Sequence, residues 1–121
     1  MNIAVLEENP DIGEMLQHGL ELAGNSVVVY SRPALFFAAL LAPPSAPFDC
    51  LIVDLPLTEG MTGVEVIQRV RKSFPALPVI LIVGGSTREI EVARRGLSGI
   101  EVLKTPLKLS TLLALLKKLA S

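Results

Sequence analysis

The stretch that decides the fold is Asp49-Cys-Leu-Ile-Val-Asp54, an apolar run with an acid directly after it. Two other runs, Ile3-Ala-Val-Leu6 and Pro78-Val-Ile-Leu-Ile-Val83, are equally short and apolar. A strand that is covered on both faces reads as a continuous apolar run. We therefore predict buried strands at 3–6, 49–54 and 78–83. Two further strands are predicted at 26–30 and 100–103.

Helix signals fill the segments between these strands. Asn9-Pro10-Asp11 is typical of a helix start, with Asn as N-cap and Pro in the first turn, and Gly24 suits the end of that helix. Thr62-Gly-Val-Glu65 and Ser86-Thr-Arg-Glu89 each fit a capping box. The remaining helices are predicted from Ser31 to the residues before Pro43, and from Pro106 to the end.

The alternation of strands and helices predicts one α/β domain over residues 1–121. Parallel strands need crossover connections, which are right-handed and place helices on both faces of the sheet. The expected fold is a three-layer, doubly wound, five-stranded parallel sheet. Strand order 2-1-3-4-5 is one of the two common orders for such sheets, and ligands bind at the carboxyl ends of the strands where the order reverses.

Composition excludes several classes of function. The formal net charge is −1 and the pI is about 5.8, so no basic surface for nucleic acid is expected. A single cysteine, Cys50, excludes an internal disulfide and suits a reducing compartment. The longest apolar stretch, 34–42, is too short to span a bilayer, and no targeting segment precedes the first strand. We expect a cytoplasmic protein that contacts no membrane.

Acidic residues follow the first and third strands. Glu7 and Glu8 come directly after Leu6, and Asp54 follows Val53. With strands one and three as neighbours, these three carboxylates would share one small space and repel one another. A hard divalent cation removes that conflict, and Mg²⁺ prefers such oxygens. A carboxylate beside Mg²⁺ is in turn a plausible nucleophile for phosphoryl transfer.

These elements resemble, over essentially the whole chain, the receiver domain of response regulators in bacterial two-component systems. No single motif is decisive, but their order and spacing together are specific. The matching stretches are Val5-Leu-Glu-Glu-Asn-Pro-Asp-Ile12, Asp49–Leu55, Gly60-Met-Thr-Gly-Val-Glu-Val66, Pro78–Gly84 and Leu103-Lys-Thr-Pro106.

The resemblance implies a role for each site residue. Asp54 would be the phosphoacceptor, and Glu7 and Glu8 would bind Mg²⁺ together with Asp54 and the backbone carbonyl of Pro56. Lys104 would contact the phosphate. A sensor histidine kinase or a phosphotransfer protein would supply the phosphoryl group. An output domain or a second copy of the chain would bind the face formed by helix 4, strand 5 and helix 5. Such a domain signals and is not an enzyme, apart from weak autodephosphorylation.

The sequence departs from the family in the acids that would bind the metal and at two positions that would contact the phosphate. The acidic pair is Glu-Glu, where the family has Asp-Asp or Glu-Asp, and Val83 stands where the family has a hydroxyl residue. Thr105 separates Lys104 from Pro106, and side chains alternate along a strand, so this shift turns Lys104 to the other face unless a bulge restores it. Two hypotheses follow: a phosphorylated receiver, and a pseudo-receiver that signals through contacts without phosphate.

An enzyme or cofactor carrier on a similar sheet is disfavoured. Glu7-Glu-Asn-Pro-Asp11 would repel the phosphate of a flavin, and the chain has no glycine pattern of a dinucleotide or P-loop site. An Asp-x-Asp phosphatase motif would need an acid at position 56, which is proline. Outside the site, His18 is expected to face solvent. Leu107 and Leu115 fall partly outside the stripe of leucines in the last helix. Apolar residues outside the core-facing stripe often mark an interface.

Overall fold

A computed structural model describes residues 1–41, 48–55, 62–84, 91 and 99–120. Its five strands form one sheet in the order β2-β1-β3-β4-β5, and every neighbouring pair is parallel. The predicted fold class and strand order are therefore confirmed. The strands are β1 (Asn2–Leu6), β2 (Ser26–Tyr30), β3 (Cys50–Leu55), β4 (Val79–Val83) and β5 (Glu101–Lys104).

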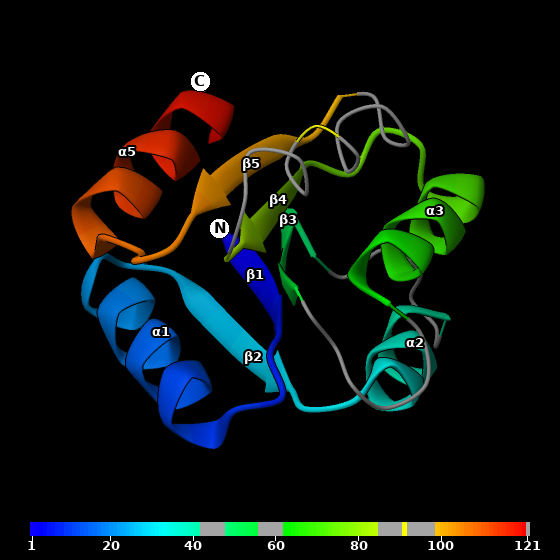
Figure 1. Ribbon diagram of the computed structural model, residues 1–121, viewed down its shortest axis with the longest axis horizontal. Coiled ribbons are helices and arrows are strands. Elements are labelled where there is room, and N and C mark those ends of the chain that lie inside the picture. Colours follow the sequence, from blue (N-terminus) through cyan, green and yellow to red (C-terminus); the bar gives the residue numbers. More distant parts are fainter. Residues whose placement is uncertain (42–47, 56–61, 85–90, 92–98, 121) are drawn as a thin grey trace.

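Helices cover both faces of the sheet. Figure 1 shows α1 and α5 on one side and α2 and α3 on the other. Within the described residues, no helix is both long enough and apolar enough to cross a membrane. The helix predicted to begin at Ser86 falls almost entirely outside the described residues. The helix bounds are α1 (Pro10–Leu22), α2 (Pro33–Leu41), α3 (Gly63–Ser73) and α5 (Leu109–Ala120).

The predicted helix ends of α1 and α3 are present. The Asn9 side chain accepts hydrogen bonds from the backbone N–H groups of Asp11 and Ile12, with Pro10 in the first turn. Gly24, directly after the C-cap, has φ 95°, a conformation that glycine adopts without strain. At α3, the Thr62 hydroxyl accepts from the Glu65 N–H and also lies 3.1 Å from the Glu65 carboxylate. The predicted capping box is therefore formed by Thr62 and Glu65, whose side chains are hydrogen-bonded to each other.

Strand alternation divides the apolar side chains into two cores. Ala4, Leu51 and Leu81 face α2 and α3, whereas Ile3 and Ile52 face α1 and α5. The continuous apolar runs of the sequence form β1, β3 and β4, and these strands have buried side chains on both faces of the sheet. The few aromatic residues gather on one side: the Phe36 ring lies 5.8 Å from that of Tyr30 and 5.2 Å from that of Phe37.

Two helices differ in how completely their apolar side chains are buried. Ile12 and Met15 of α1 are 38% and 55% exposed, because the buried face is formed by Gly13, Leu16, Gly19 and Leu20. Leu107 and Leu115 are partly buried against the core on the α1 and α5 side, and an interface at their exposed part stays a prediction.

Candidate functional site

The site is built where β1 and β3 end. Leu6 pairs with Val53 in parallel register, so Glu7 and Asp54 follow them at the same edge of the sheet. Glu7 continues the alternation of Ile3 and Val5, and Asp54 continues that of Cys50 and Ile52. Both acids therefore belong to the α1 and α5 face. Residues 47 positions apart in the chain thus follow paired strand residues at the same edge of the sheet.

Glu7 is the one charged side chain that is buried within the described residues, with 5% of it exposed. Its Oε1 atom accepts a hydrogen bond of 2.9 Å from the backbone N–H of Asn9. Its backbone N–H donates to the carbonyl oxygen of Tyr30, which extends the β1–β2 ladder by one residue. A Cβ on Gly13 would lie 3.9 Å from Glu7 Cγ, so the side chain packs against the first turn of α1.

The second carboxylate oxygen of Glu7 decides what this site can hold. Within the described part of the chain, Oε2 is buried and has no hydrogen-bond partner. A buried carboxylate oxygen without a partner costs free energy that a bound cation would offset. Mg²⁺ is bound through one or two carboxylates and keeps several waters, so this donor fits it.

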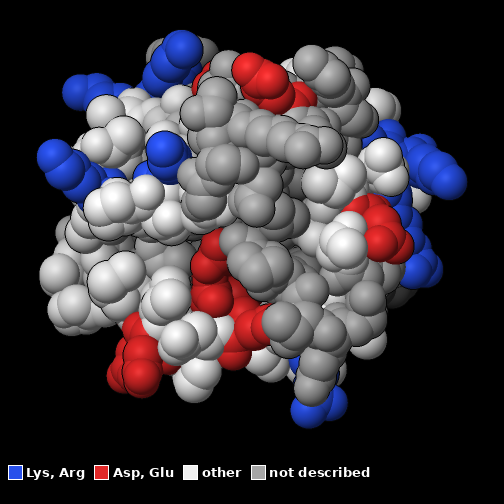
Figure 2. All heavy atoms as spheres, viewed as in Figure 1, with Lys and Arg blue, Asp and Glu red and all other residues white. Residues whose placement is uncertain are grey.

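The structure describes only part of the predicted ligand set. Among the residues that the structure describes, no three His, Cys, Asp or Glu side chains are arranged to hold a metal ion. Glu8 and Asp54 are partly exposed at the same edge, and each makes interactions of its own. Pro56, predicted to bind metal through its carbonyl, lies outside the described residues. Figure 2 shows acidic side chains in the middle of this face and basic ones around its rim.

Lys104 is the last residue of β5 and pairs with Val83. The β4–β5 register runs without interruption from Ile80 opposite Glu101, so no bulge shifts Lys104. Val102 packs into the core on the α2 and α3 side. Lys104 has the same alternation as Val102 and is exposed, so its Cα–Cβ bond starts on the face opposite to Asp54.

Sequence reasoning missed the relation between Gly84 and Thr105. The Thr105 N–H donates a hydrogen bond of 2.9 Å to the carbonyl oxygen of Val83, so the ladder continues one residue past β5. A Cβ built on Gly84 would lie only 2.9 Å from the Thr105 hydroxyl oxygen. The hydroxyl therefore occupies the space that a side chain at position 84 would need. No signal in the sequence reports such a contact between two strand ends.

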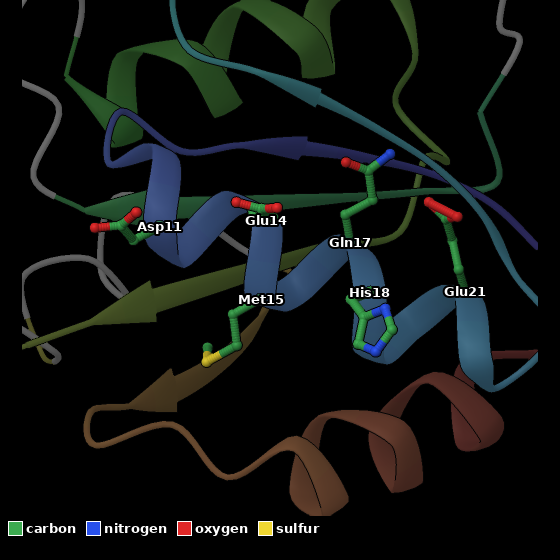
Figure 3. A pocket seen from close by; sticks show the side chains of 6 residues that line it. All are labelled: Asp11, Glu14, Met15, Gln17, His18 and Glu21. Atoms are coloured by element: carbon green, nitrogen blue, oxygen red, sulfur yellow. The ribbon is translucent and has the colours of Figure 1, made fainter.

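A shallow hollow along α1 is a second candidate. It is lined by Asp11, Glu14, Met15, Gln17, His18 and Glu21. Figure 3 shows Met15 and His18 pointing toward α5, and Glu14, Gln17 and Glu21 pointing to the other side of the helix. His18 is exposed, as expected from its position in the sequence. All six residues come from one helix, so the hollow brings together no groups that are distant in the chain.

Comparison with known proteins gives one family. The family model described as "Response regulator receiver domain" matches residues 3–117. A curated relative, the uncharacterized transcriptional regulatory protein YkoG of Bacillus subtilis, is 26% identical over 113 residues, which are 93% of this chain and 48% of YkoG. The chain thus spans about half the length of this relative.

Solved structures share the fold at low sequence identity. The chemotaxis protein CheY4 of Vibrio cholerae matches with a TM-score of 0.85 and 22% identity, covering 98% of this chain and 97% of that one. Full-length FixJ from B. japonicum matches with a TM-score of 0.83 and 22% identity, covering 98% of this chain and 57% of FixJ.

Proposed function

This chain belongs to the response regulator receiver domain family of two-component systems, and we propose that it is a phosphorylation switch with Asp54 as phosphoacceptor. Receiver domains are signalling domains and not classical enzymes. The observation that carries the proposal is the parallel pairing of Leu6 with Val53, which brings the following acids, Glu7 and Asp54, to one edge on one face. The buried Oε2 atom of Glu7 supports a cation beside Asp54.

The proposed step is an in-line displacement. A carboxylate oxygen of Asp54 attacks the phosphorus of a phosphohistidine, the new O–P bond forms as the P–N bond breaks, and the leaving imidazole nitrogen takes up a proton. Receiver domains typically bind Mg²⁺ at the acidic pocket, and the cation supplies neutralisation of the charge on the transferred oxygens. Glu7, Glu8, Asp54 and the carbonyl of Pro56 would hold it.

The proposed partners follow from the family. Receiver domains interact with histidine kinases and output domains. We expect a sensor histidine kinase or a phosphotransfer protein as donor in the cytoplasm, and an output domain or a second copy of this chain as the reader of the switch on the face that includes β5 and α5. Lys104 stays a predicted phosphate contact, because its flexible four-carbon side chain has the length to fold over the end of β5.

A pseudo-receiver is the second candidate, and specific observations favour it. Val83 offers no hydroxyl at the end of β4, and the unbroken β4–β5 register starts Lys104 on the face opposite to Asp54. In this alternative, the domain binds partners without being phosphorylated. The retained Glu7 and Asp54 favour the phosphorylated form, because these are the residues that the transfer itself needs.

Intact-mass measurement after treatment with a small acyl phosphate and Mg²⁺ tests the proposal. We expect the wild type to gain one phosphoryl group and Asp54→Asn to gain none. Asp49→Asn is the matched control, since Asp49 directly precedes the same strand at its opposite end and its carboxylate accepts a hydrogen bond from the Asn2 N–H. Absence of a mass gain in the wild type at high donor concentration would instead establish the pseudo-receiver. A gain in Asp54→Asn equal to that of the wild type would place the phosphoryl group elsewhere.

A further inference from the structure

We propose that Thr105 supplies the hydroxyl that binds the phosphoryl group on Asp54, across a gap kept open by Gly84. The inference rests on the proposed phosphorylation of Asp54. It assigns to the end of β5 the hydroxyl that Val83 cannot provide at the end of β4. Neither the sequence pattern nor the family resemblance points to a threonine at this place.

The first support is the face on which Thr105 lies. Leu103 packs into the core on the α1 and α5 side, and the hydrogen bond from the Thr105 N–H to the Val83 carbonyl keeps residue 105 in the ladder. Alternation therefore returns Thr105 to the face of Leu103. Ile52 packs into the same core, and Asp54 follows its alternation. Thr105 and Asp54 thus lie on the same face of the sheet, and Lys104 starts on the opposite face.

The second support is the space between these residues. β4 lies between β3 and β5, so the strands of Asp54 and Thr105 are two spacings apart, about 10 Å. Asp54 lies opposite Ile82 and Ile82 opposite Leu103, so Thr105 is also two residues further along β5, and the two Cα atoms are about 12 Å apart. An extended aspartyl phosphate and a threonine side chain together cover that gap with one hydrogen bond between them. Ile82 pairs with Asp54, so Gly84 lies further along the intervening strand on the same face. Having no side chain, Gly84 leaves this path open.

The third support is the close fit of Gly84 and Thr105. Because a Cβ at position 84 would lie 2.9 Å from the Thr105 Oγ1 atom, even alanine would displace the hydroxyl. Thr105 is exposed, so its hydroxyl is accessible to a group held by Asp54. A hydroxyl donates one hydrogen bond to a charged phosphoryl oxygen and brings no charge of its own, whereas the lysine that the family has directly before the proline adds a positive charge.

Four variants test the assignment: Thr105→Ala, Thr105→Ser, Gly84→Ala and the double variant Thr105→Ala/Gly84→Ala. The readouts are the rate of phosphorylation by a small acyl phosphate with Mg²⁺ and the midpoint of thermal unfolding. A hydrogen bond to a charged group changes a rate by about tenfold or more. We expect that loss in Thr105→Ala, and a rate within about threefold of the wild type in Thr105→Ser. Thr111→Ala, at an exposed position of α5, controls for the substitution itself.

The double variant separates the hydroxyl from other effects of Gly84. If the added methyl group acts only by displacing the hydroxyl, Gly84→Ala lowers the rate of phosphorylation when Thr105 is present. The double variant is then phosphorylated at the same rate as Thr105→Ala alone. Unchanged phosphorylation in Thr105→Ala would overturn the assignment, and equal losses in Thr105→Ala and Thr105→Ser would do so as well. Those results leave Asp54 as phosphoacceptor. A wild type that takes up no phosphoryl group overturns both proposals.

Discussion

Leu6 of β1 and Val53 of β3 lie opposite each other in parallel register, where the central strand of the sheet pairs with one of its neighbours. The residue after each is an acid, and both acids lie on the α1 and α5 face. The chemistry of this edge therefore depends on the pairing of two apolar residues. A slip of one residue would turn Glu7 or Asp54 to the other face.

Mg²⁺ should stabilise the folded chain through Glu7. A ligand present at a hundred times its Kd adds about 2.7 kcal/mol to the free energy of unfolding. We expect Mg²⁺ to raise the thermal midpoint of the wild type by several degrees, and to raise that of Glu7→Gln much less, because the amide is a poorer ligand. The measurement is the midpoint with and without Mg²⁺ in each variant. Glu14→Gln in α1 is the control. Equal shifts in the wild type and Glu7→Gln would contradict the assignment of Glu7.

Leu20→Ala and Leu22→Ala form a matched pair in one helix. Leu20 is fully buried in the core on the α1 and α5 side, whereas Leu22 is 76% exposed. Leu20→Ala should lower the free energy of unfolding by about 2–5 kcal/mol, because it removes buried methyl groups and leaves a cavity. Leu22→Ala should change it by no more than about 0.5 kcal/mol. Urea denaturation measures both, and similar losses would show that α1 is rotated from its described orientation.

Gly24→Ala should destabilise the chain through its backbone conformation. Gly24 has φ 95°, and an added Cβ would meet nothing within 4 Å, so steric overlap with neighbours plays no part. We expect a loss of about 1 kcal/mol in the free energy of unfolding. Gly24→Asn should lose less, because Asn adopts positive φ more readily. If alanine proved as stable as glycine in thermal unfolding, the turn after α1 would have a different conformation.

Cys50 should be unreactive in the folded chain. Burial raises the pKa of its thiol to about 12, with a further contribution from the neighbouring Asp49 charge. We expect no alkylation by iodoacetamide at pH 8 until denaturant is added, since the thiolate is the nucleophile. Labelling of the native chain at the rate of a free thiol would contradict this burial.

The same pKa makes stability depend on pH. The unfolded thiol titrates near 9 and the folded one near 12, so the unfolded state loses its proton first as the pH rises. The contribution of Cys50 is complete below pH 9 and is lost progressively up to pH 12. Cys50→Ala should therefore show a shallower loss of stability over this range than the wild type. An identical slope in both would assign the loss to other groups.

Most of the fold could be predicted from the sequence because its signals were local. The apolar runs that end at Leu6 and Val83 define strands buried on both faces, and Asn9 and Thr62 cap helices as predicted. Which side of α1 is exposed depends on the rotation of the helix about its axis, and the 3.6-residue spacing of residues such as Met15 is compatible with more than one rotation.

The site could be predicted only in part, because its elements depend on register. The meeting of β1 and β3 follows from the strand order, and the sequence supplied the acids. The face of Lys104 depends on whether a bulge occurs, and only the observed pairing of Val83 with Lys104 decides it. The Thr105 hydroxyl lies where a side chain at position 84 would be, at the ends of two neighbouring strands. No pattern of residues in the sequence predicts that proximity.

Among the residues with a described placement, the central sheet separates two cores that share no side chains, one beside α1 and α5 and one beside α2 and α3. Because of this separation, the residues of one core can change in evolution without a matching change in the other. Substitutions in the two halves should combine additively when they lie more than about 7–10 Å apart. A substitution around Phe36 in one half should therefore leave the cost of a substitution around Leu20 in the other half unchanged.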